Sequence, residues 1–315
     1  MRRASALLIV PLLAAVAFVA GCGSSSPKPS NGASPSVTVS GPFGSAPKVN
    51  IPAAAAGPSL YTKTLIQGSG APLTSTEAFE GKSVAFLWSG KTHKQEGNYT
   101  DSLFANPLMP GLATALKGAK VGSRVLAVIP AKTAFGSQGD AQLGIKPTDT
   151  LVFVVDVDKK IANSATGKQV SSGGGALPKV SSPPAGTAPT VTIPTSAPPK
   201  NLTSTTLIKG AGPKVSSGQL VLVQYTGVNW RTGKVFDSSY SRHEPMEAVL
   251  ITNPQQQGSV IPGWVKGLSG QTVGSRVLLT IPPSQGFGST GSSQAGIKGT
   301  DTIVFSVDIL AAAQS

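Results

Sequence analysis

Short runs of β-branched and aromatic residues, bounded by Gly, Pro or Ser, recur along most of the chain. In the C-terminal half they include VLVQY, RVLLTI and TIVFSVDIL, and such runs are typical of β-strands. Only IPGWVKGLSG breaks the pattern. Its apolar pairs Ile261/Val265 and Trp264/Leu268 are spaced four apart, which is typical of one helix face. The pattern therefore predicts antiparallel strands, one short helix and a long turn-rich loop between RVLLTIPP and the final strand.

Most of these runs occur twice. PKVNIP matches PTVTIP, TLIQGSG matches TLIKGAG, and PGLATALKGAKVGSRVLAVIP, from Pro110, matches PGWVKGLSGQTVGSRVLLTIP, from Pro262. Self-similarity of this kind is the signature of a duplicated domain. The sequence predicts an α+β protein with two domains, each an antiparallel half-barrel sheet wrapped around one short α-helix. We call the two halves of the repeat the first copy and the second copy.

Two segments lack the apolar residues needed for a core. Residues 23–36 and 162–188 are rich in Ser, Gly and Pro, a composition typical of flexible connectors. They divide the chain into a first domain at 37–161 and a second at 189–315.

The N-terminal segment 1–22 indicates export. MRRASALLIVPLLAAVAFVAGC has two arginines, an apolar stretch and small residues before Cys22, the only cysteine in the chain. The stretch resembles a bacterial lipoprotein signal, which implies cleavage before Cys22 and lipid attachment to it. Val19 departs from that motif, which most often has Leu at this position. A plain secretory signal and an uncleaved membrane helix are the alternatives. We expect a lipid-anchored protein on the outer face of the cell membrane.

Charge and composition exclude several functions. The formal net charge is +13, but no basic cluster is interleaved with aromatic residues, so we expect no nucleic acid partner. The two histidines, His93 and His243, lie in different copies and have no free cysteine to partner them. A metal site or a Ser-His or Cys-His nucleophile is therefore not expected, and neither is a cofactor. No Gly-rich phosphate loop is present either. Any site must use mainly apolar surface.

The second copy resembles a known family. Tyr225-Thr226-Gly227, GKVFDSS ending at Ser239, VIPGW ending at Trp264, Gly286-Phe287-Gly288 and a final strand with Phe305 look like an FKBP-type peptidyl-prolyl cis-trans isomerase. The resemblance covers nearly all of residues 220–310. The tandem layout led by a lipoprotein signal resembles actinobacterial members of that family.

The resemblance implies a site residue by residue. Trp264 forms the floor of an apolar hollow, and the Ile261 amide donates a hydrogen bond to the carbonyl of the bound peptide. Asp237 lies at the rim, where Arg242 orients it as an ion pair. The implied catalytic residues are Tyr225, Phe236, Asp237, Ile261 and Trp264. The implied substrate-binding residues are Arg242, Met246, Val260, Phe287, Ile297 and Phe305. From the residues alone, these aromatics equally fit a plain core, and Asp237 equally fits an ordinary turn.

The implied activity is isomerisation of X-Pro bonds in exported polypeptides, without a cofactor. A non-catalytic module that holds Pro-containing segments in the same hollow is the alternative, and a spacer lipoprotein is a third interpretation. Tacrolimus-like macrolides are implied ligands. Because Phe287 stands where many relatives have Tyr, and Met246 where an aromatic is common, we expect macrolide affinity to fall more than turnover. We expect a monomer.

The first copy lacks part of this set. Aligning VAFLWSG with LVLVQYTG places Trp88 at Tyr225, while Leu112 replaces Trp264. On this alignment the numbering offset between the copies rises from 137 at Trp88/Tyr225 to 152 at Pro110/Pro262, so the first copy is shorter in between. The Phe-Asp loop is within the missing part, and we predict that the first copy is inactive or nearly so. Both copies keep Arg124/Arg276 and Asp149/Asp301, which we interpret as structural.

Overall fold

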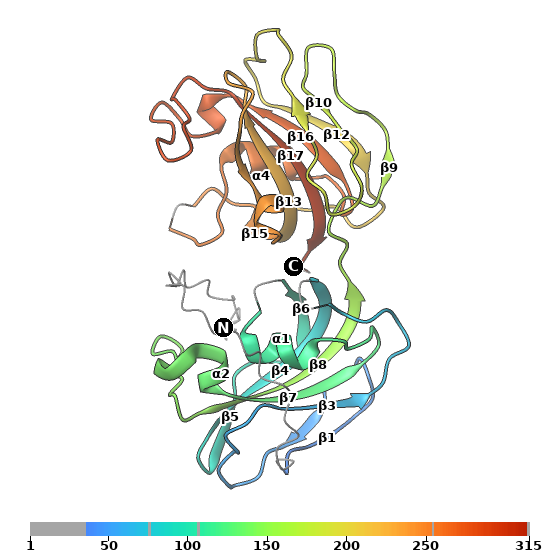
Figure 1. Ribbon diagram of the computed structural model, residues 1–315, viewed down its shortest axis with the longest axis vertical. Coiled ribbons are helices and arrows are strands. Elements are labelled where there is room, and N and C mark those ends of the chain that lie inside the picture. Colours follow the sequence, from blue (N-terminus) through green and yellow to red (C-terminus); the bar gives the residue numbers. More distant parts are fainter. Residues whose placement is uncertain (1–35, 75–76, 106–107, 254, 314–315) are drawn as a thin grey trace, which may run out of the picture. The chain divides into compact units, whose positions relative to one another are not determined.

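The computed structural model describes residues 36–74, 77–105, 108–253 and 255–313 (Figure 1). Its contacts define two compact units. The described parts of 1–75, 81–102 and 108–159 form one, and those of 76–80, 103–107 and 160–315 form the other. The predicted signal peptide and Cys22 lie outside the described residues. Across the described ranges, no helix has the length and apolar character needed to cross a membrane.

The first copy is a twisted antiparallel sheet with one main helix. Its elements in chain order are β1 (Thr38–Ser40), β2 (Lys48–Asn50), β3 (Tyr61–Ile66), β4 (Phe79–Ser89), β5 (Thr92–Gln95), β6 (Thr100–Phe104), α1 (Pro110–Leu116), β7 (Arg124–Pro130), α2 (Ala131–Phe135), the 3₁₀ turn η1 (Gly136–Gln138) and β8 (Thr150–Lys160). The sheet order is β3-β7-β8-β4-β5, and β6 also pairs with β4.

The second copy repeats this plan. Its elements are β9 (Lys168–Gln169), β10 (Lys179–Val180), β11 (Val191–Thr192), β12 (Thr203–Lys209), β13 (Leu220–Asn229), β14 (Val235–Ser238), α3 (Ser239–Arg242), β15 (Met246–Val249), α4 (Pro262–Leu268), β16 (Arg276–Ile281), the 3₁₀ turn η2 (Pro283–Gln285) and β17 (Ile303–Ala312). The order is β14-β13-β17-β16-β12-β9, and β15 also pairs with β13. The fold matches the predicted sheet and long final loop, but the one-turn helices α2 and α3 are additional to the single helix predicted for each copy.

Helix α4 sits close against the sheet because its sheet-facing side carries glycines. A Cβ at Gly263 would come within 2.5 Å of Ile281, and one at Gly267 within 2.5 Å of Leu279, both on β16. Figure 1 shows the helix lying across one face of the sheet. Pro262 is in the first turn, where its fixed backbone angle suits a helix start. The close approach buries Trp264 and Leu268 in the main core of the second copy.

The predicted linker 162–188 is not a loose connector in the structure. Lys168 and Gln169 form β9, which pairs with β12, and Val180 of β10 is 2% exposed and pairs with β11. Composition alone misled here, because a Ser- and Gly-rich segment is ordered when a sheet edge accepts its backbone hydrogen bonds. The repeat in the sequence did indicate that part of this segment belongs to the second domain. The first copy has VSGPFGSAPKVNIP from Val39, and the second has VSSPPAGTAPTVTIP from Val180, so the repeat already begins at this hairpin.

The structure also corrects the alignment of Trp88. Its indole N–H donates to Ala54 O at 2.9 Å, and the indole N–H of Trp230 donates to Ser196 O at 3.3 Å, so Trp88 corresponds to Trp230. Each tryptophan packs in the cluster that its N-terminal hairpin covers. Position 83, a serine, therefore corresponds to Tyr225. The numbering offset here is 142 rather than 137, so the first copy is shortened less than the sequence alignment predicted.

Candidate active site

Four aromatic rings form one cluster in the second copy. Phe305 lies at its centre, with ring centroids 5.2 Å from Trp264, 5.5 Å from Phe236 and 5.9 Å from Tyr225, all edge to face. Tyr225 and Trp264 are themselves 5.4 Å apart. Edge-to-face contacts of this kind add stability beyond burial alone. The cluster brings together rings from β13, β14, α4 and β17, which are widely separated in the sequence.

Five further predicted residues meet this cluster, and one does not. Ile297 belongs to the same buried core, and three partly buried side chains pack against it from outside: Met246, Val260 and Ile261. Arg242 reaches the cluster over the ring of Tyr225, 5.7 Å from its centroid. Phe287, on the loop after η2, is 36% exposed and is not part of this core.

Gly227 allows the rings of Phe236 and Phe305 to meet. A Cβ at this position would lie 2.8 Å from Phe236 Cζ and 2.8 Å from Phe305 Cε1, closer than real contacts permit. The glycine is opposite Phe305 on β17 and Asp237 on β14. The sequence motif contains Gly227 but does not show this packing role.

Both carboxylate oxygens of Asp237 accept hydrogen bonds at the edge of the aromatic cluster. The Tyr225 hydroxyl donates to Asp237 Oδ2, and Arg242 Nη1 donates to Asp237 Oδ1. Arg242 Nη2 donates to the Tyr225 hydroxyl at 2.8 Å, which closes a three-residue ring of polar contacts. The side chain of Asp237 is 40% exposed and that of Arg242 is 47% exposed. The predicted ion pair is present, and the carboxylate is at the rim rather than inside the core.

Burial sets the acidity of Tyr225. Desolvation, followed by the hydrogen bond to Asp237, raises the pKa of the Tyr225 hydroxyl to about 12. The tyrosine therefore remains a neutral donor at any physiological pH.

Two buried side chains that we did not predict support this arrangement. The β14 strand turns into α3 after Ser238, so β13 loses its backbone partner there. Ser239 Oγ takes that place, accepting from the Tyr225 N–H at 2.8 Å and donating to Gln224 Oε1. Ser239 is fully buried and Gln224 is 4% exposed. Because α3 ends at Arg242, this link connects the backbone of Tyr225 to the segment that orients Asp237. The serine pair after Asp237 was the available signal.

Two hydrogen-bond donors at the cluster have no partner. In the part of the chain that the structure describes, nothing accepts a hydrogen bond from the backbone N–H of Ile261, which caps the start of α4. The indole N–H of Trp264 is buried and also has no acceptor there. A buried donor without an acceptor costs free energy, so the Trp264 indole N–H is available to a polar group from outside.

This arrangement agrees with the comparisons with known proteins. The family model of FKBP-type peptidyl-prolyl cis-trans isomerases matches residues 77–158 and 212–310. The chain is 36% identical over 123 residues to an FK506-binding protein of Streptomyces anulatus, covering 39% of this chain and 95% of that one. It is 35% identical over 124 residues to a probable FK506-binding protein of Corynebacterium glutamicum, covering 39% and 98%. The chain belongs to the FKBP-type peptidyl-prolyl cis-trans isomerase family.

A solved isomerase structure is also similar in sequence. The peptidyl-prolyl cis-trans isomerase of Pseudomonas syringae pv. tomato is 31% identical, with 36% of this chain and 76% of that chain covered and a TM-score of 0.31. The family match in two segments shows that the isomerase has more than one FKBP-type segment, and the protein is an enzyme of this class.

The first copy of this FKBP-type enzyme differs at the site positions. Ser83 corresponds to Tyr225, Ala85 to Gly227 and Leu112 to Trp264. The residue that pairs with Ala85 across the hairpin is Glu96, whose carboxylate accepts from Lys94 at 3.1 Å. An acid is therefore present, but it lacks the tyrosine and arginine that hold Asp237.

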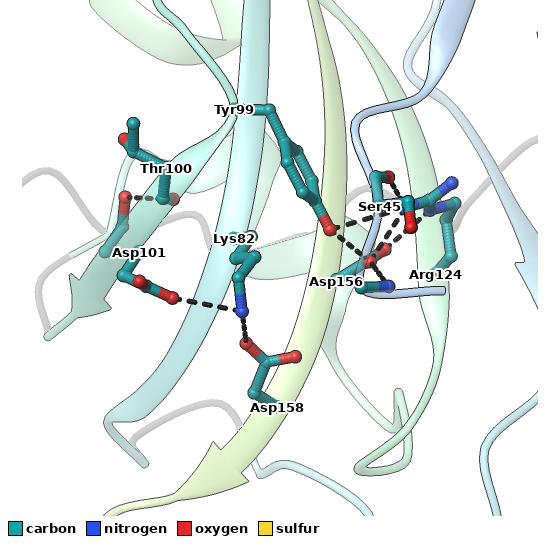
Figure 2. A network of polar contacts seen from close by, with 10 residues as sticks. Ser45, Lys82, Tyr99, Thr100, Asp101, Arg124, Asp156 and Asp158 are labelled. Atoms are coloured by element: carbon teal, nitrogen blue, oxygen red, sulfur yellow. Dashed lines mark hydrogen bonds and ion pairs between the residues drawn. The ribbon is translucent and has the colours of Figure 1, made fainter. Parts of the chain in front are cut away.

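Both copies of the isomerase share a buried ion pair elsewhere in the sheet. Arg124 donates to Asp156 in the first copy, at 2.6 Å and 2.8 Å, while Tyr99 donates to the same carboxylate (Figure 2). These hydrogen bonds outweigh burial and lower the pKa of Asp156. Arg276, Asp308 and Tyr240 repeat the arrangement in the second copy. Arg124 also donates to Gly41 O and Ser45 O, so the pair fastens the N-terminal hairpin to the sheet. The structural interpretation of Arg124 and Arg276 agrees with these contacts.

Proposed function

We propose that the second copy carries the isomerase activity of this enzyme. Ile261, whose N–H is unpaired, packs against its aromatic cluster, and Tyr225 of the same cluster donates to the carboxylate of Asp237. The unpaired Ile261 donor beside an apolar cluster is the observation that carries the proposal, because it offers a fixed hydrogen bond to a peptide whose proline covers apolar side chains.

The mechanism follows from the bond that turns. Rotation of an X-Pro amide must cross about 18–20 kcal/mol, because twisting breaks the partial double bond. Water stabilises the planar amide by hydrogen bonds to its polarised carbonyl. A proline covering Phe236, Val260 and Ile261, which are partly buried, would lose that water. Binding the twisted amide more tightly than the planar one lowers the barrier without a covalent step.

The polar ring at the rim orients Asp237 toward this amide. Tyr225 and Arg242 each contact one carboxylate oxygen, so the side chain has a fixed direction at the mouth of the apolar cluster. A fixed dipole costs no reorganisation when the bond turns. We assign Asp237, Phe236, Tyr225, Ile261 and Trp264 to catalysis on this basis.

Substitution of Asp237 and Phe236 tests the assignment. Exchange between the cis and trans forms of a short proline peptide is measured by NMR with the full chain and its variants. We expect Asp237→Ala to lower kcat/KM tenfold, corresponding to about 1.4 kcal/mol of barrier, and Asp237→Ala/Phe236→Ala to abolish catalysis. Lys94→Ala in the first copy is the matched control and should change nothing. Full activity in the double variant would show that Asp237 and Phe236 do not carry the catalysis.

We further propose that the protein acts on exported polypeptides at the outer face of the cell membrane, held there by lipid on Cys22. The arginine-led apolar segment before the only cysteine supports this location. Each buried methylene of an acyl chain contributes about 0.8 kcal/mol, so several chains give stable anchoring. Cys22→Ala should move the protein from the membrane to the soluble fraction. Retention in the membrane fraction would contradict lipidation at Cys22.

Macrolides of the tacrolimus type are proposed ligands of the same cluster. Phe287 has no hydroxyl and is exposed, so one polar contact available to a tyrosine is absent. The relatives' names mention FK506 binding, which supports a test of such ligands here. We expect these macrolides to inhibit the enzyme only weakly. We also expect the enzyme to be a monomer.

A further inference from the structure

One ion pair of the second copy is replaced by a single hydroxyl contact in the first. In the turn between β13 and β14, Arg231 donates to both carboxylate oxygens of Asp301, at 2.7 Å and 2.8 Å. Asn229, at the end of β13, donates to the same carboxylate at 2.8 Å. In the first copy Ser89 stands in place of Arg231 and donates one hydrogen bond to Asp149, at 2.8 Å. The ion pair is therefore specific to the second copy rather than part of the shared fold.

Asp301 is a buried group whose charge these contacts stabilise. Its side chain is 2% exposed, whereas that of Arg231 is 45% exposed. The hydrogen bonds from Arg231, and then from the Lys298 N–H, hold the pKa of Asp301 well below its usual range, although burial opposes this. A planar guanidinium bonded at two points to a carboxylate fixes direction as well as distance. Arg231 therefore holds Asp301 in a definite position relative to the turn after β13.

Asp301 lies near the end of the long loop between β16 and β17, residues 282–302, which we call the site loop. The Lys298 N–H donates to Asp301 Oδ2 at 2.9 Å, and the Asp301 N–H donates to Lys298 O at 3.0 Å, so residues 298–301 form a closed turn. Ile297, directly before this turn, belongs to the core that contains the aromatic cluster, and Ala295 packs against that core. The position of Asp301 is thus linked to side chains that contact the cluster.

The same turn supports the part of the site loop that carries Phe287. A Cβ at Gly299 would lie 1.8 Å from Ser289 O, so the turn lies against the backbone just after Phe287. Pro147 stands in place of Gly299 in the first copy, and its Cβ prevents the same approach. Both predicted substrate-binding residues of the site loop therefore depend on the turn that the ion pair holds.

The hairpin at the other end of the ion pair carries the proposed catalytic groups. β14 begins shortly after Arg231 and includes Phe236 and Asp237. Phe236 packs edge to face against Phe305, and Asp237 accepts from its own polar partners, so the directions of these two side chains do not rely on Arg231. The ion pair therefore sets the site loop relative to these groups rather than setting the groups themselves.

We propose that Arg231 is a positioning residue of the isomerase, which through Asp301 fixes the site loop relative to β14. The proposal rests on the proposed assignment of activity to the second copy. Because the site loop would contact the planar and the twisted peptide alike, loss of the ion pair removes uniform binding, which raises KM and leaves kcat nearly unchanged. A purely structural role for Arg231 would instead lower stability with no specific change in KM.

Steady-state kinetics of the full chain tests this role. Exchange of a short proline peptide is measured by NMR over a range of peptide concentrations, which gives kcat and KM separately. We expect Arg231→Ala to raise KM about fivefold and to keep kcat within about twofold of the wild type. Arg231→Lys keeps the charge but not the two-point geometry, and should restore KM only in part. Ser89→Ala removes the counterpart bond in the first copy and is the control that should change neither constant.

Hydrogen exchange shows the response of the site loop independently of activity. Ser292 and Ile297 each donate an N–H to the other's carbonyl, at 2.8 Å and 2.9 Å. Arg231→Ala should make these two amides exchange several-fold faster. The equivalent pair in the first copy, Asp140 and Ile145, is bonded at 2.8 Å in both directions and should be unchanged in the same sample. If Arg231→Ala does not fold, Arg231→Ser takes its place, because it gives the turn the hydroxyl partner present in the first copy.

The outcomes separate this proposal from the proposed function. An unchanged KM in Arg231→Ala, or unchanged exchange of the Ser292 and Ile297 amides, would overturn the role of Arg231 even if Asp237→Ala lowers kcat/KM as expected. A loss of kcat in Arg231→Ala as large as that in Asp237→Ala would also overturn it, since Arg231 would then act on the catalytic groups. Full activity in Asp237→Ala/Phe236→Ala would instead refute the proposed function itself.

Discussion

At the scale of single residues, the site depends on a carboxylate held at the rim of an apolar cluster. Asp237 is contacted by a neutral tyrosine and a charged arginine, so its direction is fixed although it remains 40% exposed. The sequence predicted the pair Asp237–Arg242, because both belong to one short segment. It did not predict that Tyr225 donates to Asp237, since the two lie on different strands and only the fold brings them together.

Tyr225→Phe tests the state of this hydroxyl by pH. The folded protein holds the pKa of Tyr225 at about 12, against about 10 in an unfolded chain. The unfolded state therefore loses its proton first, and the stability contributed by Tyr225 is complete below pH 10 and lost as pH rises toward 12. Absorbance at 295 nm measures the ionisation directly. The difference titration between wild type and Tyr225→Phe should be centred near pH 12, and a midpoint near pH 10 would contradict the burial of this hydroxyl.

At the scale of elements, the site depends on how closely strands and helix approach one another. Trp264 enters the cluster because Gly263 and Gly267 allow α4 to sit against β16, and the helix itself was predictable from its apolar spacing. The pairing of β13 with β14 and with β17 was not predictable, because pairing between distant strands leaves no local pattern. For the same reason, the local similarity of Trp88-Ser89-Gly90 to Tyr225-Thr226-Gly227 led to the wrong partner for Trp88 in the sequence alignment.

Gly227→Ala tests the approach of β14 to β17. The new methyl group would lie 2.8 Å from the rings of Phe236 and Phe305 and must displace one of them. Phe236 is partly buried on the edge strand and moves more easily than the buried Phe305. We expect kcat/KM to fall between about tenfold and a hundredfold, because small displacements of binding groups have effects of this size. NMR exchange measures the rate, and near-UV circular dichroism checks that the fold is retained.

The first copy supplies the control for this variant. It already has Ala85 at the corresponding position, and Ala85→Gly should leave the activity of the full chain unchanged. A Gly227→Ala enzyme with normal kcat/KM would show that the position of Phe236 does not limit the rate.

At the scale of the whole molecule, the duplication of one domain was the feature most clearly predicted by the sequence. The two copies give matching sheets, helices and N-terminal hairpins, from β1–β2 and β10–β11 onward. The boundary between connector and domain was wrong, because composition reports the chance of a segment folding alone. It does not report whether a neighbouring sheet edge has free hydrogen-bonding groups.

The true start of the second copy is testable by comparing two fragments. One begins at residue 163, before β9, and the other at residue 189, where composition alone placed the boundary. The shorter fragment loses β9, β10 and the buried Val180. Arg276 loses the contact with Ser181 O at 3.3 Å, and Asp308 loses the N–H of Ala165 at 2.8 Å. Charge-assisted bonds to buried groups are each worth about 1.5–3 kcal/mol, so the loss is a large part of the stability of one domain.

We therefore expect fragment 163–315 to unfold cooperatively and fragment 189–315 to unfold at a lower temperature, by at least about 8 °C for a domain of this size. Differential scanning calorimetry measures both. Val170→Pro in the longer fragment is a single-residue version of the same test, because it removes one of the two N–H groups, those of Val170 and Ser171, that bind Leu207 O. Equal melting temperatures for the two fragments would mean that the segment before residue 189 contributes nothing to the fold, and β9 and β10 would then be incidental to the sheet.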